Sequence, residues 1–458
     1  MYIEQIYNGC LNEAAYFIES NGEAVIIDPV RDINVYLELA SKHNAQLKYI
    51  FETKIHFTFV SGHVELSRKT DAPIVFGPMS DVKFRSHIAK DGEIFKLGNI
   101  TIEAIHTPGH TLESTCYLIR DEKNHPYCIF TGISTDDIST SAPGNSNLTE
   151  KEMAALLYHS IQNKLLPLPD DVIVYSSHSK EGGEKFTNLG IHKKENPLFQ
   201  PGTLEEFIIT HTRKIKEVPA YFNKISKLNK EGYTMMENIL EDGLKSLSIT
   251  EFKKKIKENF LVLDTRESAS FTQGFIPGSI SINLQGRFEE TAGEILPYDQ
   301  PILLITDVKK EVESVTRLAR VGFENVQGYL KGGFDQWNKS GESIDLIIDI
   351  EADELAMDMP FDENLLVLDV RTQQEFVEGH VKESTNIPLR DLQDLAQIAS
   401  LEEDQNIYIH SSTGYKSVTA ASLLKRQGYH NLRNILGGWN KIIEEEKIPT
   451  EKSGEILN

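Results

Sequence analysis

Short apolar runs, each closed by a polar or turn residue, recur along the first 180 residues of the chain. In 23–29 a run of four apolar residues is followed by Asp28 and a proline, a pattern typical of a buried strand that ends at a site. Apolar residues at helical spacing predict a helix over 151–164. The same patterns predict further strands at 47–53, 72–77, 100–106, 127–132 and 171–175 and a helix at 34–43. This alternation indicates an α/β fold.

An internal repeat occupies the C-terminal half. The hexapeptide Leu-Val-Leu-Asp-Thr-Arg at 261–266 returns as Leu-Val-Leu-Asp-Val-Arg at 366–371, and the Gly-Gly-Phe at 332–334 returns as Gly-Gly-Trp at 437–439, both 105 positions later. This period is longer than a solenoid unit, so it predicts two consecutive copies of one small domain. Each copy alternates strands and helices, which predicts a parallel sheet covered on both faces.

The chain therefore divides into four predicted parts. An N-terminal domain covers 1–200, and a lysine-rich segment without a strand pattern forms a helical connector over 201–245. The two copies of the repeat follow at 246–345 and 346–458.

Charge and hydropathy narrow the classes of partner. The 458 residues include 69 acidic and 47 basic ones, a formal net charge of -22 that opposes binding to a phosphate backbone or an anionic membrane. No apolar run approaches the ~20 residues of a membrane span, and the N-terminus lacks the pattern of a secretory signal. We expect a cytoplasmic protein with neither nucleic acid nor membrane as a partner.

The three cysteines all lie in the first third of the chain, at Cys10, Cys116 and Cys128. An odd number in a chain of this length argues against a disulfide scaffold, so free and buried thiols are expected. Cys116 and Cys128 fall on predicted strands, where they would act as small apolar core residues. No cysteine occurs after Cys128, which limits the chemistry of the repeat.

Two sets of motifs carry a family resemblance. The N-terminal part contains Glu-Thr-Lys-Ile-His at 52–56, Thr-Pro-Gly-His-Thr at 107–111, Phe-Thr-Gly at 130–132 and Tyr-Ser-Ser-His at 175–178. It resembles the metallo-β-lactamase superfamily. Each repeat has Leu-Asp-x-Arg, a phenylalanine five residues later and a late Gly-Gly-aromatic turn, and resembles the rhodanese fold.

The order of these parts resembles bacterial persulfide dioxygenase–rhodanese fusions. The resemblance implies an N-terminal metallo-β-lactamase αβ/βα sandwich followed by two rhodanese-like parallel-sheet α/β domains. It also implies a metal centre in the first part and a sulfur-carrying cysteine in the last.

The implied metal centre is altered. The superfamily binds metal through a His-x-His-x-Asp cluster, the histidine of the Thr-Pro-Gly-His turn and an aspartate after Phe-Thr-Gly. Persulfide dioxygenases use the first histidine, the turn histidine and the late aspartate on Fe(II). This chain retains His110 in the turn, but Lys54 replaces the first histidine, Ile133 replaces the late aspartate, and Thr58 and Phe59 fill the other cluster positions. We expect the Lys54 ammonium to occupy the space of the metal and to pair with a nearby acid or histidine.

An ammonium has no lone pair to offer a metal, and isoleucine cannot coordinate one. We therefore expect no cofactor; if one is bound, it is Fe(II) or Zn(II). The residual candidates for a zinc site are His56, His110 and His178, and Asp136 or Asp137 could supply a substitute carboxylate for iron.

The sulfur-transfer site is altered as well. Rhodanese chemistry uses a cysteine thiolate that carries sulfur as a persulfide, and the family's loop reads Cys-x-x-Gly-x-Arg-Ser. In copy two, Ser411 stands in the cysteine position and Lys416 in the arginine position, while copy one has Asp307 in its loop and no cysteine. A serine hydroxyl cannot carry sulfane sulfur, so we expect no sulfurtransferase activity.

The loop could still bind an anion, because backbone N–H groups ahead of a helix and a lysine favour negative charge. The candidate residues are Ser411, Ser412, Thr413, Gly414, Tyr415, Lys416 and Ser417.

These substitutions predict a pseudoenzyme: a catalytically degenerate persulfide dioxygenase–rhodanese protein with a regulatory, scaffolding or ligand-binding role in sulfur metabolism. Its expected partner is another protein or a second copy of the chain, and its expected ligand is a small anion or thiol. The alternatives are an active enzyme that oxidises glutathione persulfide, a zinc-dependent hydrolase that uses the residual histidines, and an anion-binding module at the Ser411 loop.

Overall fold

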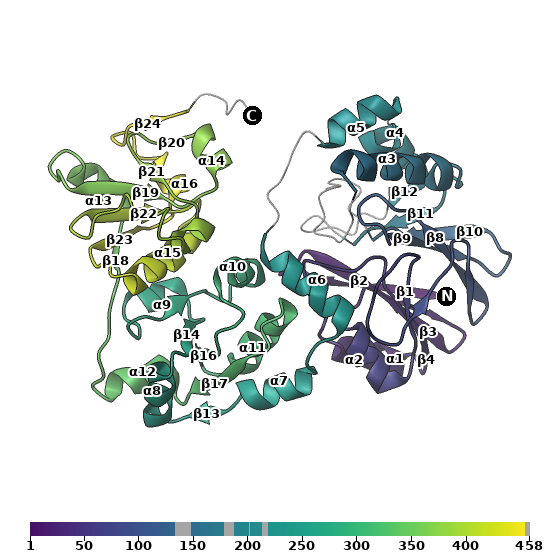
Figure 1. The fold of residues 1–458 in the computed structure, drawn as a ribbon, viewed down its shortest axis with the longest axis horizontal. Coiled ribbons are helices and arrows are strands. Elements are labelled where there is room, and N and C mark those ends of the chain that lie inside the picture. The colour runs from purple at the N-terminus through teal and green to yellow at the C-terminus, as the bar shows by residue number, and fades with distance from the viewer. Residues whose placement is uncertain (133–147, 178–186, 201, 213–218, 454–458) are drawn as a thin grey trace. The chain divides into compact units, whose positions relative to one another are not determined.

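The computed structural model of the chain describes residues 1–132, 148–177, 187–200, 202–212 and 219–453. The contacts divide it into two units, each described by itself below. The first contains Met1–Met236 and Ala319–Gly322, and the second contains Glu237–Leu318 and Phe323–Asn458. In Figure 1 the chain passes through the first unit in purple to teal and through the second in teal, green and yellow.

Two six-stranded sheets form the frame of the first unit (Figure 1). The first sheet has the order β1 (Tyr2–Asn8), β2 (Glu13–Ser20), β3 (Glu23–Ile27), β4 (Gln46–Phe51), β5 (Ile74–Phe76), β6 (His87–Ile88). The second has the order β12 (Thr187–Asn188), β11 (Ile173–Tyr175), β10 (Pro126–Phe130), β9 (Thr115–Arg120), β8 (Ile100–His106), β7 (Ile94–Leu97). The strands β3, β4, β5 and β6 pair in parallel, so their carboxyl ends share one edge.

The main core of this unit lies between the two sheets. On β2, Tyr16 and Ile18 face Tyr117 and Phe130 of the second sheet, while the alternate residue Phe17 packs toward the helices. Both faces of β2 are therefore buried, which explains its nearly continuous apolar sequence.

Helices cover the outer faces of the two sheets, giving the αβ/βα sandwich that the family resemblance implies. The helices of this unit are α1 (Asn34–Lys42), α2 (His63–Thr70), α3 (Glu150–Ser160), the π-helical turn η1 (Ile161–Leu165), α4 (Leu189–Glu195), the 3₁₀ turn η2 (Pro197–Phe199), α5 (Leu204–Thr212) and α6 (Tyr221–Glu231). The predicted helix 151–164 is thus present as α3 and η1, and all the predicted strands are present. Among the described residues, no helix is both long and apolar enough to cross a bilayer.

The prediction of buried thiols is correct for two cysteines and wrong for the third. Cys116 on β9 and Cys128 on β10 are buried, and burial raises the pKa of Cys116 to about 11. Cys10 is exposed because it lies in the turn between β1 and β2 rather than on a strand.

The second unit contains two five-stranded parallel sheets with the same strand order. The first is β13 (Ser246–Leu247), β17 (Val326–Leu330), β16 (Ile302–Ile305), β14 (Leu261–Asp264), β15 (Ile280–Ser281). The second is β18 (Ile348–Ile350), β23 (Leu432–Ile435), β22 (Asn406–His410), β19 (Leu365–Asp369), β21 (Thr385–Asn386). A separate antiparallel pair joins β20 (His380–Val381) to β24 (Thr450–Glu451).

Helices connect these parallel strands. In the first copy they are α7 (Met236–Gly243), α8 (Ile249–Lys257), α9 (Ser268–Thr272), α10 (Phe288–Ile295), α11 (Glu311–Arg320) and α12 (Gly333–Lys339). In the second they are α13 (Ala352–Asp358), α14 (Gln373–Glu378), η3 (Leu389–Gln393), α15 (Tyr415–Arg426) and α16 (Trp439–Ile442).

The repeated Leu-Asp-x-Arg motif has the same structural role in both copies. Arg266 Nη2 donates to Asp264 at 2.6 Å and its guanidinium lies 4.2 Å from the centre of a phenylalanine ring. Arg371 donates to Asp369 at 2.6 Å and lies 4.3 Å from the centre of the Trp439 ring. A carboxylate buried at the end of a strand is costly without such a partner, so the motif and the late aromatic residue recur together.

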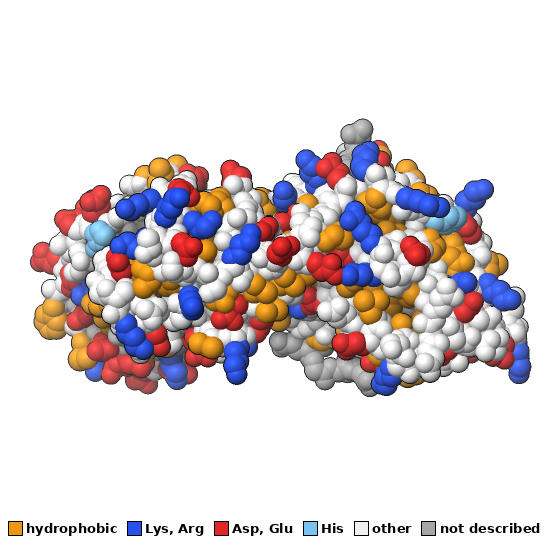
Figure 2. All heavy atoms as spheres, turned by 90° about the horizontal axis from the view of Figure 1, so that it is seen from below, with side chains coloured by type: hydrophobic (Ala, Val, Ile, Leu, Met, Phe, Trp, Pro, Cys, Tyr) orange, Lys and Arg blue, Asp and Glu red, His pale blue; other side chains and the backbone are white. Residues whose placement is uncertain are grey.

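The face shown in Figure 2 carries acidic and basic side chains interspersed with apolar ones.

Candidate functional site

Two carboxylates meet at the edge where the parallel strands of the first unit end. Asp28 directly follows β3 and Glu52 directly follows β4, and Ile27 pairs with Phe51 in the register of these strands. The Asp28 backbone has a φ of 52°, which turns the chain away from the sheet. Functional groups concentrate at such carboxyl-end edges of parallel sheets.

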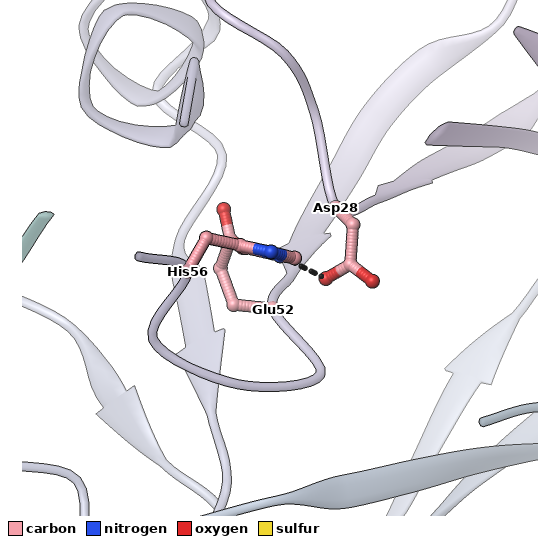
Figure 3. Close-up of side chains that lie close together, drawn as sticks. All are labelled: Asp28, Glu52 and His56. Atoms are coloured by element: carbon pink, nitrogen blue, oxygen red, sulfur yellow. Dashed lines mark ion pairs between the residues drawn. The ribbon is translucent and has the colours of Figure 1, made fainter. Parts of the chain in front are cut away.

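The ring of His56 lies against both carboxylates. Its Nε2 atom lies 3.1 Å from Asp28 Oδ1 and 3.2 Å from Glu52 Oε2, and Figure 3 shows the ring edge directed at Asp28. Asp28 also accepts hydrogen bonds from Thr53 N and Thr53 Oγ1, both at 2.7 Å, and from Ser177 Oγ at 3.2 Å. All five residues are buried.

Glu52 links His56 to a second histidine. Its Oε1 atom lies 2.9 Å from His63 Nδ1 and also accepts a hydrogen bond from the Ser61 hydroxyl. Ser61 and His63 stand at the start of α2, so the network joins the end of β4 to that helix.

Asp28 and His56 each favour the charged form of the other. Burial opposes a charge on His56, but Asp28 and then Glu52 more than offset it and raise the pKa of His56 to about 9, against the opposing effect of Lys54. Burial likewise opposes ionisation of Asp28, but His56 and Lys54 lower the pKa of Asp28 overall. The two side chains therefore form a buried ion pair at the edge of the sheet.

Lys54 links this loop to the second sheet. Its ammonium is buried and donates a hydrogen bond to the carbonyl of Gly132, just after β10. Gly132 has a φ of 61°, and a Cβ there would lie 2.0 Å from Thr53 Oγ1, so only glycine fits. The sequence led us to expect an acid or a histidine as the partner of Lys54, whereas the structure gives it a backbone carbonyl as hydrogen-bond acceptor.

The other altered ligand positions have structural contacts. Thr58 Oγ1 donates to Glu13 at 3.1 Å, and the ring of Phe59 packs on that of His56 with centroids 4.4 Å apart. His110 is buried beside Phe57, with ring centroids 5.7 Å apart. The predicted positions Ile133, Asp136, Asp137 and His178 lie outside the described residues.

These residues do not fit the iron triad that the resemblance implies, because an ammonium stands at one ligand position. A different ligand set is close enough to be considered: ligand atoms of Asp28, Glu52 and His56 lie within 4.8 Å of one another. A metal there would have to displace the proton of His56, because Nε2 is the atom that faces both carboxylates. Both His56 ring nitrogens and Glu52 Oε2 are buried without a hydrogen bond of good geometry among the described residues, so the contacts of Nε2 are those of ion pairs.

The loop predicted to bind an anion joins β22 to α15 and folds back on itself. Ser411 is buried; its hydroxyl accepts from Gly414 N at 3.1 Å and its carbonyl accepts from Trp439 N at 2.7 Å. Ser417 donates to Asn434 at 2.6 Å. Both serine hydroxyls are therefore engaged within the protein.

Other polar side chains of this loop also form hydrogen bonds within the protein. Ser412 donates to the Glu375 carboxylate at 2.8 Å, and Tyr415 donates to the carbonyl of Asn283 at 2.7 Å. A carboxylate beside the loop repels an anion. Lys416 acts electrostatically on Glu294, whose pKa is raised chiefly by burial. The structure thus brings the predicted residues together in one loop but satisfies most of their polar groups internally.

The corresponding loop of the first copy follows β16. Thr306 Oγ1 donates to the carbonyl of Asp307 at 3.0 Å, and the same carbonyl accepts from Lys310 N at 3.0 Å. Lys309 adopts a left-handed φ of 70°. All three cysteines of the chain lie far earlier in the sequence, in the first unit.

Sequence reasoning missed His410, which is fully buried directly before Ser411. Its Nε2 lies 3.6 Å from Asp369, its ring stacks on Trp439 at 6.1 Å, and neither ring nitrogen has a hydrogen-bond partner in the described residues. Burial, assisted by Arg371 and opposed by Asp369, lowers the pKa of His410 to about 4. The sequence feature that could have identified His410 is its position at the end of an apolar strand.

His410 predicts a loss of stability in acid. Its folded-state pKa of about 4 lies below the ordinary 6.5, so the unfolded chain takes up the proton first as the pH falls through this interval. The free energy of unfolding of the wild type should therefore fall by about 2 kcal/mol between about pH 7 and pH 5. Urea unfolding of the wild type and of His410→Leu at both pH values measures this fall. The variant should lack this part of the change in unfolding free energy with pH. The exposed residue His430, changed to Gln, is the control, and an unchanged slope in His410→Leu would contradict the assignment.

Comparison with known proteins agrees with this architecture. Residues 248–340 and 351–445 match the family described as "Rhodanese-like domain". The N-terminal part is similar to the probable hydroxyacylglutathione hydrolase glo2 of Schizosaccharomyces pombe, 29% identical over 178 residues, which are 38% of this chain and 66% of that protein. It is also similar to the cytoplasmic hydroxyacylglutathione hydrolase of Arabidopsis thaliana, 28% identical over 162 residues, 35% of this chain and 60% of that protein. The chain thus spans less than two thirds of the length of each of these relatives.

Among solved structures, a metallo-beta-lactamase from Staphylococcus aureus subsp. aureus COL is similar over 72% of this chain and 99% of its own, with a TM-score of 0.64 and 27% identity. ETHE1 from Myxococcus xanthus is similar over 50% of this chain and 98% of its own, with a TM-score of 0.44 and 23% identity. The chain therefore consists of an N-terminal domain with the metallo-β-lactamase fold followed by two domains of the rhodanese-like family.

Proposed function

We propose that this chain is a catalytically degenerate member of the metallo-β-lactamase–rhodanese group in sulfur metabolism, with a regulatory or scaffolding role. The observation that carries this is the buried Lys54 ammonium, which occupies a metal-ligand position and is tied to the Gly132 carbonyl. A fixed positive charge there opposes a metal cation and offers it no lone pair. Such a role would act through a protein partner or a second copy of the chain.

The second half supports the same function. Ser411 stands where sulfur transfer needs a thiolate, and its hydroxyl already accepts a hydrogen bond from Gly414. A hydroxyl is not a sulfur carrier, and no cysteine follows Cys128. The contact between Ser412 and Glu375 also weighs against an anion-binding role for this loop.

A second candidate is a metal-dependent hydrolase or oxidase of the N-terminal domain. The proximity of Asp28, Glu52 and His56 favours it, and the relatives named hydroxyacylglutathione hydrolase suggest a glutathione conjugate as substrate. The ion pair between Asp28 and His56 favours the degenerate function over this candidate, because a bound dication would have to displace the His56 proton.

Metal content separates the two candidates. We expect untagged protein, purified without chelators, to hold well below one equivalent of iron or zinc by plasma mass spectrometry. Its melting temperature should be the same with and without EDTA, since Lys54 and His56 supply the positive charge of the cluster. One equivalent of either metal, or a clear drop in melting temperature with EDTA, would favour the second candidate.

Lys54→Met tests the structural role of the ammonium. The variant leaves the buried carboxylates with one cation fewer, so it should lose about 3 kcal/mol of unfolding free energy in urea. Lys48→Met on β4 is the matched control, because Lys48 forms a partly exposed pair with Glu23 at 3.4 Å and should cost less than about 1 kcal/mol. Equal losses of unfolding free energy in the two variants would contradict a structural role for the Lys54 ammonium.

Ser411→Cys tests the loss of sulfur transfer. Wild type should show no thiosulfate-to-cyanide sulfur transfer, while Ser411→Cys should acquire one sulfur atom from thiosulfate, as read by intact mass. Ser412→Cys is the neighbouring control and should react less, because the Glu375 carboxylate next to it raises the pKa of a thiol. Sulfur transfer by the wild type would refute the degenerate assignment of this domain.

A further inference from the structure

The first strand of the first unit has an outer edge that is open to another strand. β1 (Tyr2–Asn8) ends the first sheet, and no strand in the described part of the chain pairs with its outer side. It is seven residues long, while every other strand at a sheet edge among the described residues has four or fewer. Unpaired backbone N–H and C=O groups along such an edge form a template for a further strand. β1 therefore offers the longest template of this kind in the described structure.

The sequence of β1, Tyr-Ile-Glu-Gln-Ile-Tyr-Asn, lacks the features by which edge strands avoid pairing. Proteins protect such edges with lysine, proline, a bulge or a very short strand. β1 contains no basic residue and no proline, and it pairs with β2 in a regular register from one end to the other. Its one charged residue is Glu4. By contrast, the four-residue edge strand β7 carries Lys96.

The apolar side chains of β1 are only partly covered by the chain itself. Ile3 packs at the margin of the core between the two sheets, and Ile6 packs at the margin of the core beneath helices α1 and α2. Both remain partly exposed. Tyr2 and Tyr7 are 37% and 39% exposed. Because side chains alternate along a strand, a strand added at this edge would cover apolar groups on both faces of the sheet.

We propose that the outer edge of β1 pairs with β1 of a second copy of the chain, antiparallel about a two-fold axis at Gln5. Ile3 of each copy would then lie opposite Tyr7 of the other, a pairing of β-branched and aromatic side chains that stabilises sheets. Glu4 would lie opposite Ile6, so the one charge of the strand would not meet its own copy. The surface is separate from the altered metal and sulfur positions, so it does not rest on the proposed function.

Symmetry and charge together select this register. A two-fold axis normal to the sheet must pass at a residue that faces its own copy, because only then do opposite side chains lie on the same face. An axis at Glu4 would place two carboxylates against each other, which destabilises a cross-strand pair. An axis at Ile6 would leave Tyr2 and Ile3 beyond the end of the partner strand. Gln5 is the middle residue of β1, so an axis there pairs all seven positions.

Sedimentation velocity of the full chain over about 1–100 µM tests this. A single pair of strands buries less than the ~1,200 Å² of a standard interface, so the dimer should dissociate within that range. Gln5→Lys sets two ammonium groups face to face across the axis and should raise the dissociation constant at least tenfold. Gln5→Glu should do the same with two carboxylates. An equimolar mixture of these two variants should form the dimer again, because each lysine then faces a glutamate.

Gln46→Lys is the matched control, since Gln46 is an exposed glutamine on β4, in the interior of the same sheet. It makes the same change of charge and should dimerise as the wild type does. Recovery of the dimer in the mixture also shows that both Gln5 variants are folded. A wild type that stays monomeric over the whole range, Gln5→Lys dimerising as tightly as the wild type, equal weakening by Gln46→Lys, or a mixture no tighter than its components would each overturn the assignment.

Discussion

Two buried carboxylates at the ends of neighbouring strands impose the main constraint on the first unit. The parallel pairing of β3 with β4 fixes Asp28 and Glu52 side by side, out of contact with water. Charges in such a position are stable only with cations or strong donors next to them. His56 and Lys54 act in this way on Asp28, and both lower its pKa.

The second unit meets the same constraint in a different way. Each buried strand-end aspartate has an arginine two residues later, at 2.6 Å in both copies, with an aromatic ring against the guanidinium. These pairs belong to the fold and are separate from the residue that would carry sulfur. Ser411 can therefore replace a cysteine without disturbing the pairs that stabilise the strand ends.

The sequence was sufficient for the architecture because apolar runs and a 105-residue period reflect burial directly. It also exposed the chemical changes at Lys54 and Ser411, since each is a matter of residue type. It could not predict that Glu52 bridges His56 and His63, because that contact depends on the path of the loop between β4 and α2. The burial of His410 was missed although its place at the end of an apolar strand was a signal; β22 is the central strand of its sheet, and its last four residues are all buried.

The altered sites share a physical pattern. In both regions that depart from the family pattern, an internal partner satisfies the polar atoms: the Gly132 carbonyl accepts from Lys54, and Glu375 accepts from Ser412. Such internal pairing stabilises the fold, because unpaired buried polar groups are costly.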